Sequence, residues 1–379
     1  MLRRDWIEFL GQFSERDSEL LLRTYDVLMN NVYESGNYLW MPYRCISPGK
    51  ETFQGIWNWD SAFHSVGVSR YDYQLAKEGV LGFLKFQKEN GFLPDCIFED
   101  GTIVESCSKP PVFAWAAQEM YKREGDLDFL KEIYPKLSRN VDFWENERLY
   151  NGLFFYDASN KESEKYLTYA KYESGWDNSV RWDNGITNHW PIDLNCYMVM
   201  FYRSMSFFAN ELGIIADAEK WGRKHKELSE LINQKMWNSE NRYYADVNRF
   251  TGEYSTVLSP ASFMPLYIDI ATVERADAMR IIAEDKFNYK MPTVSFDNPQ
   301  YSNDYWRGPT WLNVAYFAAK GLKNYKFEVA DKIKDNILNM CYNEKNGIYE
   351  NYDSVTGKGL CCDHFSWSCV FITEFILNF

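Results

Sequence analysis

Acidic side chains recur beside tryptophan and tyrosine in several short tracts that are rich in turn-forming residues. The clearest tracts are Trp57–Asp60, Gly175–Ser179, Arg181–Gly185, Asp304–Gly308 and Tyr349–Asp353. A protein core does not need carboxylates among large aromatic rings, because burying an unpaired charge is costly. A sugar needs both, since hydrolysis of its acetal takes two carboxyl groups and its hydroxyls need hydrogen-bonding partners. The tracts therefore predict a carbohydrate site.

Asp177 is the first carboxyl group with a chemical role to consider. It lies between Trp176 and Asn178. A neighbouring indole excludes water and raises the pKa of a carboxyl group, which suits a general acid that must hold its proton near neutral pH. The alternative is structural, an Asx turn in which the side chains of Asp177 and Asn178 bond to nearby backbone. The residues alone leave both interpretations open.

Glu350 is the second such carboxyl group. Within Gly347–Asp353, an alternating strand would place Glu350 and Tyr352 on the same face. A carboxylate beside a ring suits a general base that orients water. The alternative is an exposed glutamate on a hairpin. Asp177 and Glu350 are far apart in the chain, so only a closed fold would bring them to one crevice.

Two further charged residues are candidates for holding a sugar. Asp60 follows Trp57 and Trp59, which favours sugar binding, although a helix N-cap is the structural alternative. Arg307 could clamp a hydroxyl or a carboxylate, or neutralise a catalytic acid. Its structural alternative is an ion pair with Asp304. The neighbouring tract around Trp182 and Asp183 receives no assigned role.

The four histidines, His64, His189, His225 and His364, are too scattered to predict a metal centre. His364 precedes Phe365–Ser368 and is a candidate site residue, with a core histidine as the alternative. The chain has no Gly-rich phosphate loop, no GxSxG elbow and no convincing Cys/His arrangement. We therefore expect neither a cofactor nor a metal.

The composition of the whole chain excludes several classes of function. The 379 residues carry a net charge of −13, which argues against a nucleic-acid partner or an anionic membrane surface. Mean hydropathy is −0.47, and no apolar run approaches the roughly 18 residues of a membrane span. No signal peptide follows Met1, and the eight cysteines lack zinc-ligand spacing. We expect a cytoplasmic protein with free thiols; the sequence does not indicate an oligomeric state.

The elements that would position these residues are mostly helices. Apolar residues recur with helical spacing over residues 19–32, 60–68, 73–89, 112–124, 127–149, 193–212, 216–236, 261–268, 272–284, 310–320, 327–341 and 366–377. Short links join several segments in pairs, which implies antiparallel neighbours. Long connectors separate the pairs at fairly regular intervals.

This layout predicts an all-α fold, a closed toroid of six helical hairpins in one domain spanning residues 1–379. The long loops would form a crevice at one end. The alternative is an open helical solenoid, although the chain carries no repeated consensus motif of the kind that solenoids have.

Several tracts, in their order along the chain, resemble signature blocks of glycoside hydrolase family 63. They are residues 57–63, 173–179, 305–311 and 349–357, with further similarity at Lys109–Pro111 and Phe365–Ser368. The sequence is most similar to the bacterial branch around mannosylglycerate hydrolase, and family 37 trehalases are related. The resemblance runs from near Gly36 to the C-terminus.

This resemblance implies an (α/α)6 barrel that hydrolyses an α-glycosidic bond with inversion. Asp177 matches the position of the family's general acid and Glu350 that of its general base. The N-terminal β-sandwich and long insertions of larger members are not seen in this chain, so a small glycoside or disaccharide is the expected substrate. The expected substrate-binding residues are Trp57, Trp59, Asp60, Trp176, Asn178, Trp306, Arg307, Gly308, Tyr352, His364 and Trp367.

We therefore expect an inverting hydrolase of an α-linked glucoside or mannoside, whose two carboxyl groups stand about 6.5–9.5 Å apart. A trehalase-like disaccharide hydrolase is one alternative. A sugar isomerase or epimerase on the same toroid is another, and it would rely on histidines in the crevice. A non-catalytic carbohydrate sensor would keep the aromatic residues and lose the acid pair. The sequence identifies neither the sugar nor the leaving group.

Overall fold

The computed structural model describes residues 3–36 and 42–379. Its α-helices are α1 Arg3–Leu10, α2 Glu15–Asn30, α3 Asn58–Val68, α4 Tyr73–Leu84, α5 Phe113–Glu124, α6 Leu127–Glu147, α7 Tyr166–Ser174, α8 Ile192–Glu211, α9 Ile215–Lys235, α10 Met264–Tyr267, α11 Val273–Phe287, α12 Leu312–Asn324, α13 Val329–Asn343 and α14 Ser366–Leu377. The 3₁₀ helices are η1 Val180–Trp182, η2 Ile186–Asn188 and η3 Pro260–Phe263.

The strands are short and pair in antiparallel ribbons. They are β1 Val32–Tyr33, β2 Cys45–Ile46, β3 Gly55–Trp57, β4 Cys96–Phe98, β5 Ile103–Val104, β6 Leu149–Tyr150, β7 Leu153–Phe154, β8 His189–Trp190, β9 Trp237–Asn238, β10 Tyr243–Tyr244, β11 Val247–Asn248, β12 Asn351–Tyr352 and β13 Gly359–Leu360.

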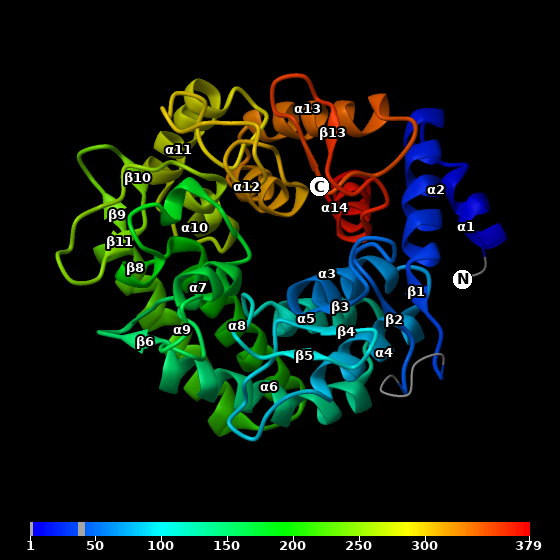
Figure 1. The fold of residues 1–379 in the computed structure, drawn as a ribbon, viewed down its shortest axis with the longest axis horizontal. Coiled ribbons are helices and arrows are strands. Elements are labelled where there is room, and N and C mark those ends of the chain that lie inside the picture. Colours follow the sequence, from blue (N-terminus) through cyan, green and yellow to red (C-terminus); the bar gives the residue numbers. More distant parts are fainter. Residues whose placement is uncertain (1–2, 37–41) are drawn as a thin grey trace.

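The helices form two concentric rings (Figure 1). Helices α3, α5, α8, α10, α12 and α14 make the inner ring, and α2, α4, α6, α9, α11 and α13 lie outside it. Each inner helix packs against the next one around the ring, and α14 packs back against α3. This closure confirms the predicted (α/α)6 toroid and excludes the open solenoid.

The two rings differ in burial as their sequence patterns differ. Every residue of the inner helix α3 is buried. In the outer helix α9, by contrast, the buried side chains are Ala218, Trp221, Leu228 and Ile232. A helix that is apolar on one stripe covers a core, whereas one surrounded by other elements is buried on all sides.

Capping residues explain the short links between paired helices. Helix α5 ends at Gly125, whose φ of 67° is left-handed and therefore suits glycine. The carboxylate of Asp126 then accepts a hydrogen bond from the backbone N–H of Phe129 at 2.9 Å and caps α6. The chain thus turns from the inner to the outer ring within two residues.

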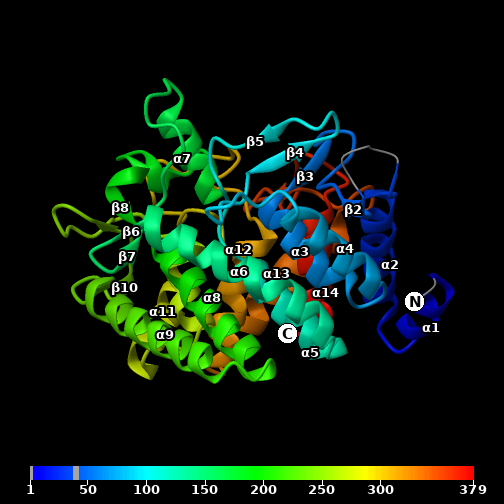
Figure 2. The same cartoon turned by 90° about the horizontal axis from the view of Figure 1, so that it is seen from below.

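The long connectors gather at the end of the toroid where inner helices begin, on the upper side of Figure 2. There β3 pairs with β4 and β4 with β5, and β3 ends at Trp57 directly before α3. Helix α7 lies in one of these connectors and was not predicted. Its sequence lacks a continuous apolar face, and only Ala170, Glu173 and Ser174 are buried.

Aromatic side chains fill the centre of the ring. Phe63 and Phe317 are fully buried, with ring centroids 6.4 Å apart. Phe63 also contacts Trp59 at 5.6 Å and Trp115 at 6.0 Å. Trp59 lines a cavity among the long loops, and Trp115 lines a second cavity formed by other residues. The axis of the toroid is therefore packed core between two hollows.

Candidate active site

A cavity with about 470 Å³ of empty space lies among the long loops, at the beginnings of α3, α12 and α14. Its charged side chains are Asp60, Lys109, Asp177 and Glu350. The other lining residues are Pro48, Phe53, Trp57, Trp59, Gly175, Tyr305, Trp306, Trp311, Phe365 and Trp367. The closed fold thus brings Asp177 and Glu350 to one cavity.

A sharp turn at the end of α7 holds Asp177 at the cavity. Gly175 follows the helix with a left-handed φ of 71°. A Cβ atom on Gly175 would lie 2.4 Å from the ring of Trp59, so this turn needs glycine. Asp177 Oδ1 is buried and has no hydrogen-bond partner among the described residues. Burial raises the pKa of Asp177, and the charge of Lys109 opposes that shift.

Glu350 directly precedes β12 and is 3% exposed. Its two carboxylate oxygens accept separate hydrogen bonds. The Tyr305 hydroxyl donates to Oε1 at 2.8 Å, and the backbone N–H of Cys362 donates to Oε2 at 3.4 Å. Burial raises the pKa of Glu350 to about 7, although both hydrogen bonds oppose the shift. Donors to both oxygens favour the ionised carboxylate.

Tyr305 reaches Glu350 from an unusual backbone conformation. Its φ of 48° is left-handed, which is strained for a residue other than glycine. The indole Nε1 of Trp311 donates to the carbonyl oxygen of Tyr305 at 2.8 Å and holds this conformation. Strain of this kind persists only where surrounding contacts impose it, and here it aims a hydroxyl at a buried carboxylate.

Lys109 supplies the positive charge of the cavity. Its Nζ lies 3.2 Å from Asp95 Oδ1 and donates to the carbonyl oxygen of Tyr172. Burial alone would lower the pKa of Lys109, but the charges of Asp95 and Asp177 outweigh it and the pKa is raised. Burial raises the pKa of Asp60 to about 8, with Lys109 opposing. The ammonium group of Lys109 therefore interacts electrostatically with several buried carboxyl groups.

Indole rings form the walls of the cavity. Trp306 stacks on Trp311 with centroids 3.9 Å apart and planes 11° apart. Trp59 meets Trp367 edge-on at 5.0 Å. Trp57 is the partly exposed member of the set. Flat rings of this kind can stack on the C–H faces of a sugar while their N–H groups seek polar partners.

Arg307 and Asn178, which the sequence predicts as substrate-binding residues, are not among the residues that line the cavity. The Arg307 guanidinium donates to both carboxylate oxygens of Asp183, at 2.9 and 2.8 Å, and to the Asn178 carbonyl oxygen at 3.0 Å. The Asn178 side chain donates to Asp304 at 3.0 Å and accepts from the backbone N–H of Trp306 at 2.9 Å. These contacts connect the Asp177 loop to the 304–307 loop.

Trp176 and Tyr352 also lie outside the lining. Trp176 is fully buried and packs on Trp306 with centroids 5.0 Å apart, so it supports a cavity wall from behind. Tyr352 is fully buried, and its hydroxyl accepts a hydrogen bond from the backbone N–H of Tyr349 at 3.2 Å. Their aromatic character reflects packing beneath the site.

Gly308 and His364 are the last two predicted binding residues that the structure places elsewhere. Gly308 packs against backbone, since a Cβ atom there would lie 2.1 Å from the Ser302 carbonyl oxygen. His364 is exposed, and its Nδ1 lies 2.8 Å from Asp363 Oδ1. Neither residue is among those that line the cavity.

Several lining residues were not predicted as site residues, namely Pro48, Phe53, Lys109, Gly175, Tyr305, Trp311 and Phe365. Lys109, Tyr305, Trp311 and Phe365 fall within or beside the tracts that carry the family resemblance. The sequence therefore indicated the tracts that form the site. What periodicity does not show is which side chain of an irregular loop faces inward.

No histidine lines the cavity in the described part of the chain, whereas the isomerase or epimerase alternative would rely on histidines there. His64 instead bonds to the Ser366 hydroxyl at 2.6 Å, and His189 bonds to the Gly185 carbonyl oxygen at 2.8 Å.

Across residues 3–36 and 42–379, no three His, Cys, Asp or Glu side chains are grouped to hold a metal. None of the helices described there is long and apolar enough to cross a membrane.

A family model of the mannosylglycerate hydrolase MGH1-like glycoside hydrolase domain matches residues 54–368. The matched region contains both Asp177 and Glu350. The chain belongs to this family. It is a glycoside hydrolase, and its predicted similarity to the mannosylglycerate hydrolase branch of family 63 is confirmed.

Individual proteins show the same relationship. A mannosylglycerate hydrolase of Rubrobacter radiotolerans is 23% identical over 87% of this chain and 92% of its own length. The crystal structure of the family 63 mannosylglycerate hydrolase of Thermus thermophilus in complex with glucose has a TM-score of 0.80 at 22% identity, covering 95% of this chain and all of the other. A periplasmic trehalase of Salmonella newport is 24% identical over 87% of this chain and 66% of its own length.

Proposed function

We propose that this glycoside hydrolase is an inverting α-glycosidase, with Asp177 as general acid and Glu350 as general base, in a single catalytic domain spanning residues 1–379. The supporting observation is a contrast between two carboxyl groups in one cavity. Both oxygens of Glu350 accept hydrogen bonds, which favours the carboxylate. Asp177 Oδ1 is buried without a partner among the described residues, which favours the protonated group.

The proposed reaction is a single displacement. Asp177 donates its proton to the glycosidic oxygen as the bond to the anomeric carbon breaks. On the opposite face of the sugar, Glu350 removes a proton from the water that attacks this carbon. The Tyr305 hydroxyl keeps the receiving carboxylate oriented. Before the next turnover, Glu350 loses the proton it gained and Asp177 takes one up from solvent.

The cavity walls supply the groups that would hold the sugar. Trp57, Trp59, Trp306 and Trp367 offer flat faces to its C–H groups. Asp60 offers a carboxyl group whose pKa of about 8 lets it donate or accept a hydrogen bond near neutral pH. These residues would fix the ring between acid and base.

We propose a small α-linked glucoside or mannoside as the substrate. The modest size of the cavity supports this choice, as do the relatives called mannosylglycerate hydrolases and trehalases. An acidic aglycone such as glycerate would require a cation, and Lys109 already lies 3.2 Å from Asp95. Since this pairing occupies the cation that a glycerate group would need, a neutral disaccharide is a second candidate substrate beside mannosylglycerate.

A substrate panel with NMR detection tests the proposal. The panel contains mannosylglycerate, glucosylglycerate, trehalose and other α-linked disaccharides. Inversion predicts that the sugar whose anomeric carbon is attacked appears first as the β anomer. Hydrolysis that yields this sugar first as the α anomer would disprove inversion. Failure to cleave any α-glycoside would disprove the assignment to α-glycosidases.

We also propose a reducing cytoplasm as the location of the protein. All eight cysteines are free thiols, and most of them are buried. Free thiols persist in the cytosol and tend to oxidise in exported proteins. Fractionation of the source cells tests this proposal, which recovery of the enzyme in an oxidising compartment would contradict.

A further inference from the structure

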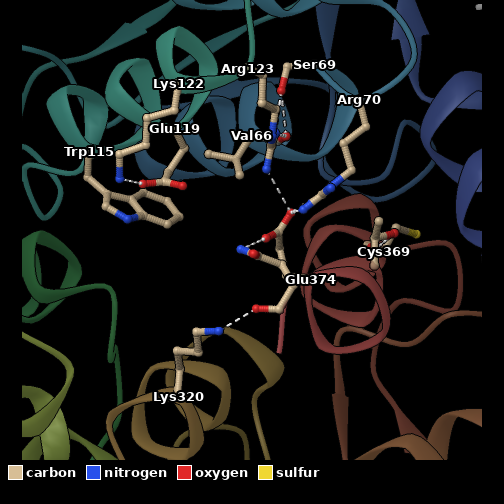
Figure 3. Close-up of polar contacts among 12 residues, drawn as sticks. Val66, Ser69, Arg70, Trp115, Glu119, Lys122, Arg123, Lys320, Cys369 and Glu374 are labelled. Atoms are coloured by element: carbon tan, nitrogen blue, oxygen red, sulfur yellow. Dashed lines mark hydrogen bonds and ion pairs between the residues drawn. The ribbon is translucent and has the colours of Figure 1, made fainter. Parts of the chain in front are cut away.

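A second cavity, here called the rear cavity, lies among the inner helices on residues distinct from those of the candidate active site. It is open to solvent, has about 930 Å³ of empty space including that opening, and is lined by residues of α5, α8, α10, α12 and α14. Figure 3 shows Trp115, Glu119 and Lys122 on one side of an open space, facing Lys320 and Glu374 on the other. No lining residue is shared by the two cavities.

In the described part of the chain, two cations line the rear cavity without an ion-pair partner, Arg203 of α8 and Lys320 of α12. No carboxylate described there lies within ion-pair distance of either. Arg203 donates to the carbonyl oxygen of Ile268, and Lys320 donates to that of Asn378. Burial lowers the pKa of both cations, and nearby carboxylates reverse this only in part. Because neither cation is paired with a carboxylate in the described residues, an added anion could pair with both.

The carboxylates at this cavity are already neutralised by other partners. Glu374 accepts from Arg70 at 2.6 Å and from Arg123 at 3.2 Å, as Figure 3 shows. Glu119 pairs with Lys122 at 2.7 Å. Cations thus outnumber carboxylates around the rear cavity, although the whole chain has a net charge of −13. A cavity with an excess of positive charge attracts anions, even on a protein whose net charge is negative.

The rear cavity also has an aromatic wall. The indole Nε1 of Trp115 donates to the hydroxyl of Tyr267 at 3.1 Å, which fixes the two rings relative to each other. Tyr316 lines the same cavity. Phe63 and Phe317 both lie against Trp115, at 6.0 and 5.6 Å, and close the cavity toward the core. Rings beside cations suit a ligand with an organic body as well as a charge.

We propose that the rear cavity is a binding site for a small organic oxyanion, a phosphate ester or a carboxylate. Its charged group is held by Arg203 and Lys320, and its body packs against Trp115, Tyr267 and Tyr316. The site is independent of the proposed catalytic roles, because it shares no residue with the catalytic cavity.

Calorimetric titration with four probes tests the proposal: glucose 6-phosphate, glucuronate, inorganic phosphate and glucose. The two organic anions distinguish phosphate from carboxylate recognition, and glucose is the neutral control. We expect at least one organic anion to bind. Lys320→Gln weakens its binding by about tenfold, because a desolvated charge pair is lost. Lys320→Arg restores the charge and keeps the affinity within about threefold.

Lys323→Gln is the matched control, since it removes one positive charge from the same helix but does not line the cavity. It binds the organic anion as the wild type does. Because Lys320 does not line the catalytic cavity, any binding there survives in Lys320→Gln, and the difference reports the rear cavity alone. Three results would overturn the proposal: no organic anion binds, Lys320→Gln binds unchanged, or inorganic phosphate and glucose bind as tightly as the organic anions.

Discussion

At the scale of single residues, the carboxyl groups of the candidate active site keep their protons to a higher pH than carboxyl groups in water do. Asp60, Asp177 and Glu350 are all buried, and the charge of Lys109 offsets the effect of burial on Asp60 and Asp177. The pKa of each carboxyl group is therefore raised. What separates their roles is local hydrogen bonding, because the hydroxyl of Tyr305 favours the charged form of Glu350.

The first prediction concerns the acidic limb of the pH profile. The proposed base must be ionised, so kcat/KM of the wild type should fall below a pH of about 7. Tyr305→Phe removes a donor that favours the carboxylate, so the pKa of Glu350 rises further. The limb should move to higher pH by about one to two units, since a hydrogen bond to a charged group contributes about 1.5–3 kcal/mol.

The matched control is Tyr349→Phe, a partly exposed tyrosine beside Glu350 whose ring packs against Gly359. It should leave the limb in place. A limb that stays fixed or moves to lower pH in Tyr305→Phe would contradict the role given to this hydroxyl.

At the scale of elements, two loops must be held together for the acid to face the base. Asn178 links the Asp177 loop to the backbone of Trp306, and Arg307 joins the same loop to Asp183. From its residues alone, Arg307 could equally clamp a substrate group or pair with Asp304, and the family resemblance favoured substrate binding. Its actual partner lies 124 positions away, and such a pairing is visible only in the folded chain.

A double-mutant cycle tests this structural role for Arg307. Arg307→Gln and Asp183→Asn should lower kcat by similar amounts, about tenfold each, because each releases the same loop contact. The double variant should be little worse than either single variant. Lys131→Gln breaks an exposed ion pair of α6 and should leave kcat unchanged. A much larger loss for Arg307→Gln than for Asp183→Asn would instead indicate direct contact with substrate.

At the scale of the whole molecule, the toroid follows from patterns that the sequence carries openly. Apolar periodicity and the link at Gly125 predict paired helices, and ring closure follows once each pair must bury a face against the next. Helix α7 could not be predicted in this way, since its burial depends on the loops around it rather than on its own pattern. The same limit applies to Lys109, which is buried only because distant segments meet over it.

Concentrating buried carboxyl groups at one end of the barrel has a consequence for its stability. The pKa of Asp60 is about 8 in the folded protein, above its usual value of 3.8. Between these values the folded state binds more protons, so stability falls as pH rises from about 4 to about 8. Asp60→Asn removes this fall in stability with pH, because an amide does not ionise. It should be more stable than the wild type at pH 8 by a few kcal/mol, since each pKa unit corresponds to about 1.4 kcal/mol.

Urea unfolding at pH 5 and pH 8 measures this difference, with the exposed Asp363→Asn as the control. The advantage of Asp60→Asn should grow with pH, while Asp363→Asn should follow the wild type. An advantage for Asp60→Asn that is equal at both pH values, or that shrinks at pH 8, would contradict the buried, proton-retaining state of Asp60.

The assignment of acid and base is tested most directly by changing the leaving group. An α-glycosyl fluoride of the preferred sugar needs little help from a proton donor, whereas an alcohol leaving group needs it. Asp177→Asn should therefore lower kcat/KM for the alcohol glycoside by about 10²–10⁴ but spare the fluoride, while Glu350→Gln should impair both. Equal losses on both substrates in Asp177→Asn, or selective sparing of the fluoride in Glu350→Gln, would contradict the proposed mechanism.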